Sequence, residues 1–310
     1  MNKKSFVYLA ALAIFSAFVS CSSDNDTIGG GNNDKEYFDP TSIVIKKSKG
    51  SVNSEEKWND IVIDKNGNIK SFEHVFVKNG VEQERSKYDI RRPGNKMIAD
   101  IEVSDANGNI IKNLLEMSEL NENGLIAKIE TFDMNYPDLP VSTKTFEYNG
   151  LTCSKFTYMG NDCEITCDYS WAGYKLSRTT ERVVDLNTGR KETNIYSYTF
   201  DDEEIYPYEG MSMFPFVQSE RDNNAVPHIY ASLGYFGMVT PYIVKEETQE
   251  RYITTNSQMG PGFDDKRQDI KKVFDFNNKN SRGEVKYDIS STDKDTKVDL
   301  YDEYTITFIE

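Results

Sequence analysis

The stretch Ile63-Asp-Lys-Asn-Gly-Asn-Ile69 places an Asn-Gly step between two apolar residues. Glycine reaches positive φ without a Cβ clash, and asparagine tolerates that region better than most residues. An Asn-Gly step between apolar alternations is therefore a strong signal for a β-hairpin turn. A fifth Asn-Gly step stands at residues 79–80, and the seven-residue pattern itself recurs three times, at residues 104–110, 120–126 and 146–152.

These turns also predict the register of the strands that they join. A two-residue loop would set Leu120 opposite Ala127, whereas a three-residue loop with glycine in the left-handed bulge position pairs Leu120 with Ile126. Apolar cross-strand pairs are favourable, and a one-residue slip would turn a strand's apolar set to the wrong face. We therefore predict the bulged loop, with the pairs Ile63–Ile69, Ser104–Ile110 and Leu120–Ile126.

The rest of the chain follows the same plan as the turns. From residue 41 to residue 200, short runs of alternating apolar and polar residues are separated by glycines or turn clusters, and the alternation resumes after residue 242. Evenly spaced turns between alternating runs are typical of an antiparallel meander. We predict an all-β fold for residues 41–310, an extended and curled antiparallel meander of many short strands.

An irregular insert at residues 205–242 interrupts this plan. It is rich in proline and aromatic residues, and Pro227 and Gly234 bracket one short helix at residues 228–233. Inserts on a rigid scaffold often carry binding residues, and tyrosine offers both an apolar ring and a polar hydroxyl. We predict a ligand-binding surface bordered by Tyr206, Tyr208, Tyr230, Tyr235 and Tyr242. The alternative is that the insert plugs one end of the sheet and buries these rings as core.

The first twenty residues have the pattern of an export signal. Lys3 and Lys4 precede an apolar run that is too short for a membrane-spanning helix. The run ends in Phe18-Val19-Ser20-Cys21, which resembles a bacterial lipobox and implies lipidation of Cys21. An ordinary signal peptide with a chance cysteine is the alternative.

Residues 21–40 are polar and glycine-rich, so they predict a flexible tether. The tether begins with serines and acids at residues 22–26, which resemble the signal that sends Bacteroidetes lipoproteins to the outer face of the outer membrane. Any acidic tether would look similar, so a periplasm-facing anchor is the alternative to surface display.

Composition and motifs exclude several classes of function. The chain carries 51 acids and 36 bases, and its net charge of -15 opposes a phosphate backbone, so we predict no nucleic-acid partner. The sequence holds no His-Glu-x-x-His motif and no Walker loop. The Asp64-x-Asn66 spacing lacks the distal glutamate of a calcium loop. We therefore predict neither a cofactor nor a metal site.

Three cysteines follow Cys21, namely Cys153, Cys163 and Cys167. A three-residue turn over residues 159–161 would place Cys153 opposite Cys167, where a disulfide suits an exported protein. Buried free thiols in a strand pair are an equal alternative.

The Asp-x-Asn-Gly-Asn-Ile repeats, together with Leu233-Gly-Tyr-Phe-Gly237, resemble those of Bacteroidetes cell-envelope lipoproteins of unknown function. A more distant resemblance is to the tyrosine-aspartate repeats of large surface proteins. The resemblance covers most of residues 41–255 and implies a fold and an outer-membrane address, with no established catalytic residues. We expect a lipid-anchored binding or scaffold module for glycan or envelope protein. The alternative is an exported carbohydrate-active enzyme with paired carboxylates, but no pair stands out and we favour a non-enzymatic role.

Overall fold

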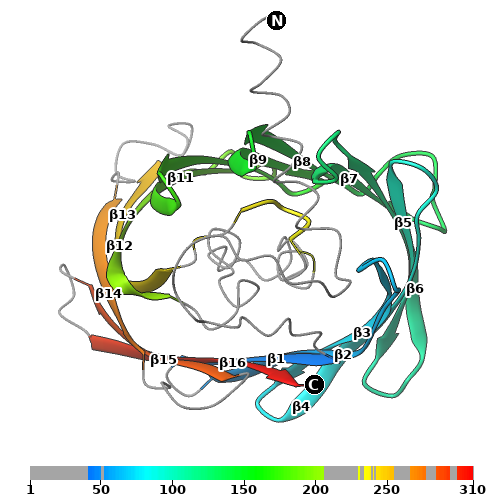
Figure 1. Cartoon of the computed structure of the whole chain (residues 1–310), viewed down its shortest axis with the longest axis horizontal. Helices are drawn as coiled ribbons and strands as arrows, with labels where there is room; N and C mark the ends of the chain where they lie inside the picture. The colour runs from blue at the N-terminus through cyan, green and yellow to red at the C-terminus, as the bar shows by residue number, and fades with distance from the viewer. Residues whose placement is uncertain are drawn as a thin grey trace, which may run out of the picture.

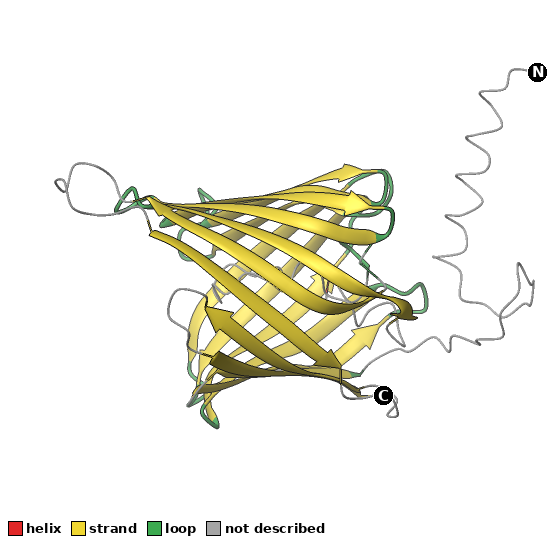
Figure 2. Cartoon of the chain, turned by 90° about the vertical axis from the view of Figure 1, so that its left-hand side faces the viewer, coloured by secondary structure: helices red, strands yellow, loops and turns green. Residues whose placement is uncertain are grey.

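The structure, a computed structural model, describes residues 41–49, 52–205, 230, 234–238, 240, 242–254, 266–276, 284–293 and 299–309. Sixteen antiparallel strands follow one another around a closed barrel, which is seen along its axis in Figure 1. The strands run obliquely around the wall, as Figure 2 shows. Among the described residues, no helix is long and apolar enough to cross a membrane.

The first eight strands are β1 Ser42–Lys49, β2 Val52–Ile63, β3 Ile69–Lys78, β4 Val81–Arg91, β5 Lys96–Asp105, β6 Ile110–Leu120, β7 Ile126–Asp133 and β8 Ser142–Asn149. The second eight are β9 Thr152–Gly160, β10 Cys163–Ala172, β11 Lys175–Asp185, β12 Lys191–Ile205, β13 Tyr242–Thr254, β14 Lys266–Phe276, β15 Glu284–Asp293 and β16 Asp299–Ile309.

The predicted curled antiparallel meander is confirmed, and it goes further than predicted because its two ends meet. β1 pairs with β16 in a register that sets Ser42 opposite Ile309. Closure removes the two edge strands that an open sheet would leave with unpaired backbone groups. Many of the strands are also longer than the short ones expected, up to the 15 residues of β12.

Three of the Asn-Gly turns, at residues 66–67, 107–108 and 123–124, have the predicted bulged geometry, whereas the steps at 79–80 and 149–150 stand in two-residue turns that pair Lys78 with Val81 and Asn149 with Thr152. Asp64 Oδ1 accepts hydrogen bonds from the backbone amides of Asn66 and Asn68, both at 2.9 Å, and Gly67 has a φ of 77°. An acceptor at the first turn position and a glycine at positive φ are what this loop requires. The predicted pairs are confirmed: Ile63–Ile69, Ser104–Ile110 and Leu120–Ile126.

The antiparallel order divides the hairpin turns between the two ends of the barrel. Turns that follow even-numbered strands lie at one end, together with the start of β1 and the finish of β16; we call this the terminal end. Turns that follow odd-numbered strands lie at the opposite end, which we call the distal end.

On strands β4 and β5 the wall of the barrel is largely apolar on its inner face and largely charged on its outer face. On β5, Ile101 and Val103 are buried in the core, whereas the intervening Asp100 and Glu102 are exposed. Beyond Val81, the outward positions of β4 are polar, at Arg85, Lys87, Asp89 and Arg91. Arg91 of this row forms an exposed ion pair with Asp100 of β5 at 3.0 Å. The apolar core therefore lies within the barrel.

Candidate ligand-binding site on the inner wall

The described part of the insert is bound to three hairpins at the terminal end. Tyr235 accepts a hydrogen bond from the Ile69 amide at its hydroxyl, at 3.4 Å, and one from the Ile126 amide at its carbonyl, at 2.8 Å. The Met238 amide donates to the Leu151 carbonyl at 2.8 Å. Residues 234–238 therefore link the turns β2–β3, β6–β7 and β8–β9.

Two of the five predicted ligand-binding tyrosines are packed in the core. Tyr230 has no exposed surface, and its hydroxyl donates to Glu116 Oε1 at 3.2 Å. Tyr235 is also buried, with the guanidinium carbon of Arg92 5.0 Å from its ring centroid. For these two rings the structure favours the alternative, in which the insert fills one end of the barrel.

Of the remaining three tyrosines, Tyr242 is the one that the structure describes. Tyr242 is half-buried at the start of β13, with the Lys175 ammonium 4.5 Å from its ring centroid. Tyr206 and Tyr208 lie outside the described residues, as do Cys21, the signal, the tether and the predicted helix at residues 228–233 apart from Tyr230.

The cysteines differ from the predicted register. Cys167 lies opposite Phe156 rather than Cys153, because Gly160 ends strand β9 without a positive φ and residues 161–162 make the turn. The three-residue turn at 159–161 is therefore wrong. Cys153, Cys163 and Cys167 are buried and have free thiols, which matches the second alternative drawn from the sequence.

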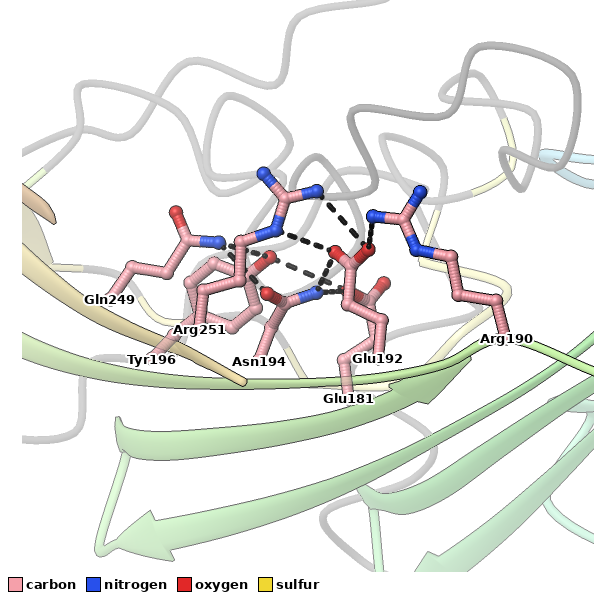
Figure 3. Close-up of polar contacts among 7 residues, drawn as sticks. All are labelled: Glu181, Arg190, Glu192, Asn194, Tyr196, Gln249 and Arg251. Carbon is pink, nitrogen blue, oxygen red and sulfur yellow. Dashed lines mark hydrogen bonds and ion pairs between the residues drawn. The ribbon is translucent and has the colours of Figure 1, made fainter. Parts of the chain in front are cut away.

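Polar side chains replace the apolar lining of the inner wall on β11, β12 and β13. The register aligns Glu181 of β11 with Asn194 of β12, and Asn194 with Arg251 of β13. The next row aligns Tyr196 with Gln249 in the same way. Figure 3 shows these side chains together with Arg190 and Glu192, all on one side of the sheet. We call these seven residues the inner polar patch: Glu181, Arg190, Glu192, Asn194, Tyr196, Gln249 and Arg251.

Asn194 is the centre of the patch. Its side-chain Nδ2 donates to Glu181 Oε2 at 2.8 Å and to Glu192 Oε1 at 3.0 Å. Its Oδ1 accepts from Gln249 Nε2 at 3.1 Å. The Tyr196 hydroxyl donates to Glu181 Oε2 at 3.4 Å. Because buried polar groups are costly unless they are hydrogen-bonded, this network fixes the side chains in one arrangement.

Two arginines surround Glu192. Arg251 Nε lies 3.0 Å from Glu192 Oε1, and Arg251 Nη2 donates to Oε2 at 3.1 Å. Arg190, at the β11–β12 turn, lies 3.5 Å from the same Oε2. Both carboxylate oxygens are therefore in contact with a cation.

Thr179 precedes Glu181 on the same inward row of β11 and lies opposite Tyr196. Its side chain is buried, and its hydroxyl has no hydrogen-bond partner among the residues that the structure describes. A buried hydroxyl without a partner is unfavourable by about 1 to 3 kcal/mol. Thr179 therefore has unused hydrogen-bonding capacity on this wall.

Aromatic side chains border the polar patch on the side of the terminal end. Tyr196 and Tyr198 of β12 pack with Leu176 and Val244 in a small apolar cluster, and Trp171 lies against it. The inner wall therefore presents aromatic rings beside carboxylate, amide and guanidinium groups. Apolar surface with a few placed polar groups is the usual composition of a small-molecule site.

The sequence analysis missed the inner polar patch. Its signal was present in residues 179–196, where Thr179, Glu181, Glu192 and Asn194 occupy the alternate positions that elsewhere carry apolar residues. Such strands appear polar on both faces, so their alternation alone does not mark the face that lies inside the barrel.

Fold and site together define a closed antiparallel barrel with a charged outer wall and an inner polar patch. No family model matches the chain, and no curated protein matches it. Among solved structures, it is similar to a porin-like protein from Bacteroides vulgatus, with 12% identity and a TM-score of 0.50 over 87% of this chain and 98% of that one. A porin-like protein from Bacteroides uniformis gives 10% identity and a TM-score of 0.49, over 87% and 95%. At 12% identity, the first likeness shows the fold alone.

Proposed function

We propose that this chain is a lipid-anchored cell-envelope protein that binds a glycan on the inner polar patch of its barrel. The main support for this proposal is the hydrogen-bond network centred on Asn194, which connects carboxylate, amide and hydroxyl groups on one wall of the barrel. Sugars present many hydroxyls that both donate and accept, so they match a wall of mixed donors and acceptors next to aromatic rings.

The charges of the patch support a neutral polar ligand over an ion. Glu181 and Glu192 are balanced by Arg190 and Arg251, so the four groups sum to zero formal charge. No group of His, Cys, Asp or Glu in the described part of the chain could hold a metal ion. A ligand with hydroxyls, and without strong charge, would meet this wall with little electrostatic penalty.

The second candidate function is a carbohydrate-active enzyme, and Glu181 and Glu192 now form its specific carboxylate pair. Both contact the same Asn194 amide, so they lie close together. Arg251 contacts both oxygens of Glu192, however, and occupies positions that a nucleophile or a proton donor would need. Binding without turnover is therefore the better supported function.

The outer wall and the lipobox-like stretch support a barrel held beside the membrane rather than within it. Barrels embedded in lipid present an apolar band about 25 Å tall on their outward positions. Here the outward positions of β4 include Lys87, Asp89 and Arg91, all exposed. A lipid on Cys21 and the tether at residues 21–40 would attach such a barrel. We favour surface display over a periplasm-facing anchor because of the acidic start of the tether.

A hydroxyl-deletion experiment tests the proposed glycan site. Thr179→Val removes an inward hydroxyl that has no partner among the described residues, so folding loses little. Its matched control is Thr180→Val on the outward face of the same strand, where Thr180 lies opposite Asp168 and Ile195. On an array of oligosaccharides, we expect the wild-type chain to retain a defined set of glycans without releasing products.

For the retained glycan, the loss of one hydrogen bond in Thr179→Val should weaken binding about tenfold, while Thr180→Val should bind as the wild type does. Equal affinities for the two variants would refute the inner polar patch as the binding site. If the wild-type chain releases reducing sugar and Glu181→Gln does not, the protein is instead a carbohydrate-active enzyme.

A further inference from the structure

Exposed apolar side chains gather at the distal end of the barrel. Of the ten large hydrophobic residues exposed within the described part of the chain, eight lie in or beside turns that follow odd-numbered strands. Tyr136 and Leu139 of the β7–β8 turn are 78% and 76% exposed. The eight are Val81, Ile110, Ile111, Met134, Tyr136, Leu139, Met159 and Leu186. Exposed apolar side chains in one contiguous region mark interaction sites more often than isolated ones do.

These turns are neighbours, and backbone hydrogen bonds connect them. Ser142, which follows the β7–β8 turn, pairs with Gly160, which precedes the β9–β10 turn. The Leu186 amide of the β11–β12 turn donates to the Asp162 carbonyl of the β9–β10 turn at 2.8 Å. The apolar side chains therefore stand on a continuous and ordered rim. We call the turns β7–β8, β9–β10 and β11–β12 the distal rim.

The distal rim is also acidic. In the β7–β8 turn, Asp138 lies between Tyr136 and Leu139. In the β9–β10 turn, Asp162 follows Met159. At the β11–β12 turn, Asp185 precedes Leu186. The cations in or beside these three turns are Arg190, which lies 3.5 Å from Glu192, and the exposed Lys191 at the start of β12. Each turn therefore pairs a carboxylate with an exposed apolar side chain.

We propose that the distal rim docks a protein partner whose surface combines apolar residues with lysine or arginine. The carboxylates select this occupant by charge complementarity, because like charges repel an anionic lipid surface and a second acidic copy of this chain. The rim and the inner polar patch share Arg190 alone, and none of the exposed apolar or acidic residues of the rim belongs to the patch, so this inference does not depend on the proposed glycan function.

Photocrosslinking with the full-length chain in the cells that produce it tests the docking surface. The photoreactive residue p-benzoylphenylalanine replaces Tyr136 in one variant and Tyr174 in the control. Tyr174 is 60% exposed and lies in the β10–β11 turn at the terminal end. We expect a protein adduct from position 136 that is absent from position 174. The protein in that adduct, identified by mass and then purified, is the probe for titration.

In the titration, Asp138→Lys should weaken binding of that protein about tenfold or more, and added salt should weaken binding to the wild type. Tyr136→Ser should weaken binding by a similar factor through loss of apolar contact. The proposal is overturned if position 136 gives no specific adduct or crosslinks a second copy of the chain. Unchanged affinity in Asp138→Lys would also overturn it, as would Tyr136-dependent binding to phosphatidylglycerol vesicles.

Discussion

Arg251 holds Glu192 across the β12–β13 pair through two contacts, Nε to Oε1 at 3.0 Å and Nη2 to Oε2 at 3.1 Å. The Glu192 side chain is only 6% exposed, so little water reaches its carboxylate. Arg182 and Asp168 form a comparable pair on the outer wall, but their side chains are 53% and 46% exposed. Loss of the buried pair on the inner face is therefore expected to destabilise the fold more than loss of the exposed pair on the outer face.

Removing Arg251 should be far more destabilising than removing Arg182. Arg251→Ala removes from a buried carboxylate the cation that contacts both of its oxygens, and we expect a loss of about 2 to 4 kcal/mol in the free energy of unfolding. Arg182→Ala breaks an exposed pair, and we expect a loss below about 1 kcal/mol. Urea unfolding of both variants measures the difference. Similar losses would show that Glu192 is not held in a water-poor site.

The local features of this fold were readable from the sequence. An Asn-Gly step restricts its own backbone and the apolar residues beside it select the register, so the pairs Ile63–Ile69 and Leu120–Ile126 could be predicted locally. The cysteine register failed at Gly160, because a glycine can stand in a strand as well as in a turn and the local sequence fits both.

Closure of the barrel and the inner polar patch could not be read in the same way. The pairing of β1 with β16 joins residues at opposite ends of the chain, and no local pattern encodes it. The patch draws Glu181, Asn194 and Arg251 from three strands, and β12 and β13 are separated by the insert. Which polar residues face inward becomes visible only when the register of all three strands is known.

Two glycines with the same φ separate backbone strain from steric contact. Gly108 and Gly237 both have a φ of 81°. A Cβ at Gly108 would meet nothing within 4 Å, whereas one at Gly237 would lie 2.2 Å from the Leu151 carbonyl oxygen. Gly108→Ala should cost about 1 kcal/mol through strain alone. Gly237→Ala should cost at least about 1 kcal/mol more, because the insert must move away from the β8–β9 turn. Thermal unfolding of the two variants checks the order, and equal shifts would contradict the close approach.

Substitution of Cys21 tests the anchor. Acyl chains on this cysteine would contribute about 0.8 kcal/mol of membrane affinity per buried methylene group. Cys21→Ala should therefore move the chain from the membrane fraction to the aqueous fraction or leave it unprocessed. Ser20→Thr, next to the cleavage point, provides a control that keeps the thiol. Unchanged fractionation and mass for Cys21→Ala would refute lipid anchoring, and an aqueous chain with intact unfolding would support a barrel that does not need lipid.

Asp105 and Asn121 occupy equivalent positions in two Asn-Gly turns, and only one of them titrates. The side-chain amide of Asn109 and the backbone amides of Asn109 and Asn107 hold the pKa of Asp105 below its usual value. Asn121 Oδ1 accepts the equivalent backbone hydrogen bonds, from Asn123 at 2.9 Å and Leu125 at 3.0 Å.

Acidification should therefore separate the two positions. A carboxyl group whose pKa is lowered by folding contributes stability that is complete above the unfolded pKa, about 3.9 for Asp, and is lost as the pH falls through the folded value. The destabilisation caused by Asp105→Ala should be largest at neutral pH and should shrink below about pH 3. The destabilisation caused by Asn121→Ala should stay constant, because an amide does not titrate. The urea midpoints of the wild type and of both variants, measured at neutral pH and below about pH 3, give these destabilisations. If the destabilisation shrinks equally for Asp105→Ala and Asn121→Ala, general acid unfolding rather than the Asp105 carboxylate causes the change.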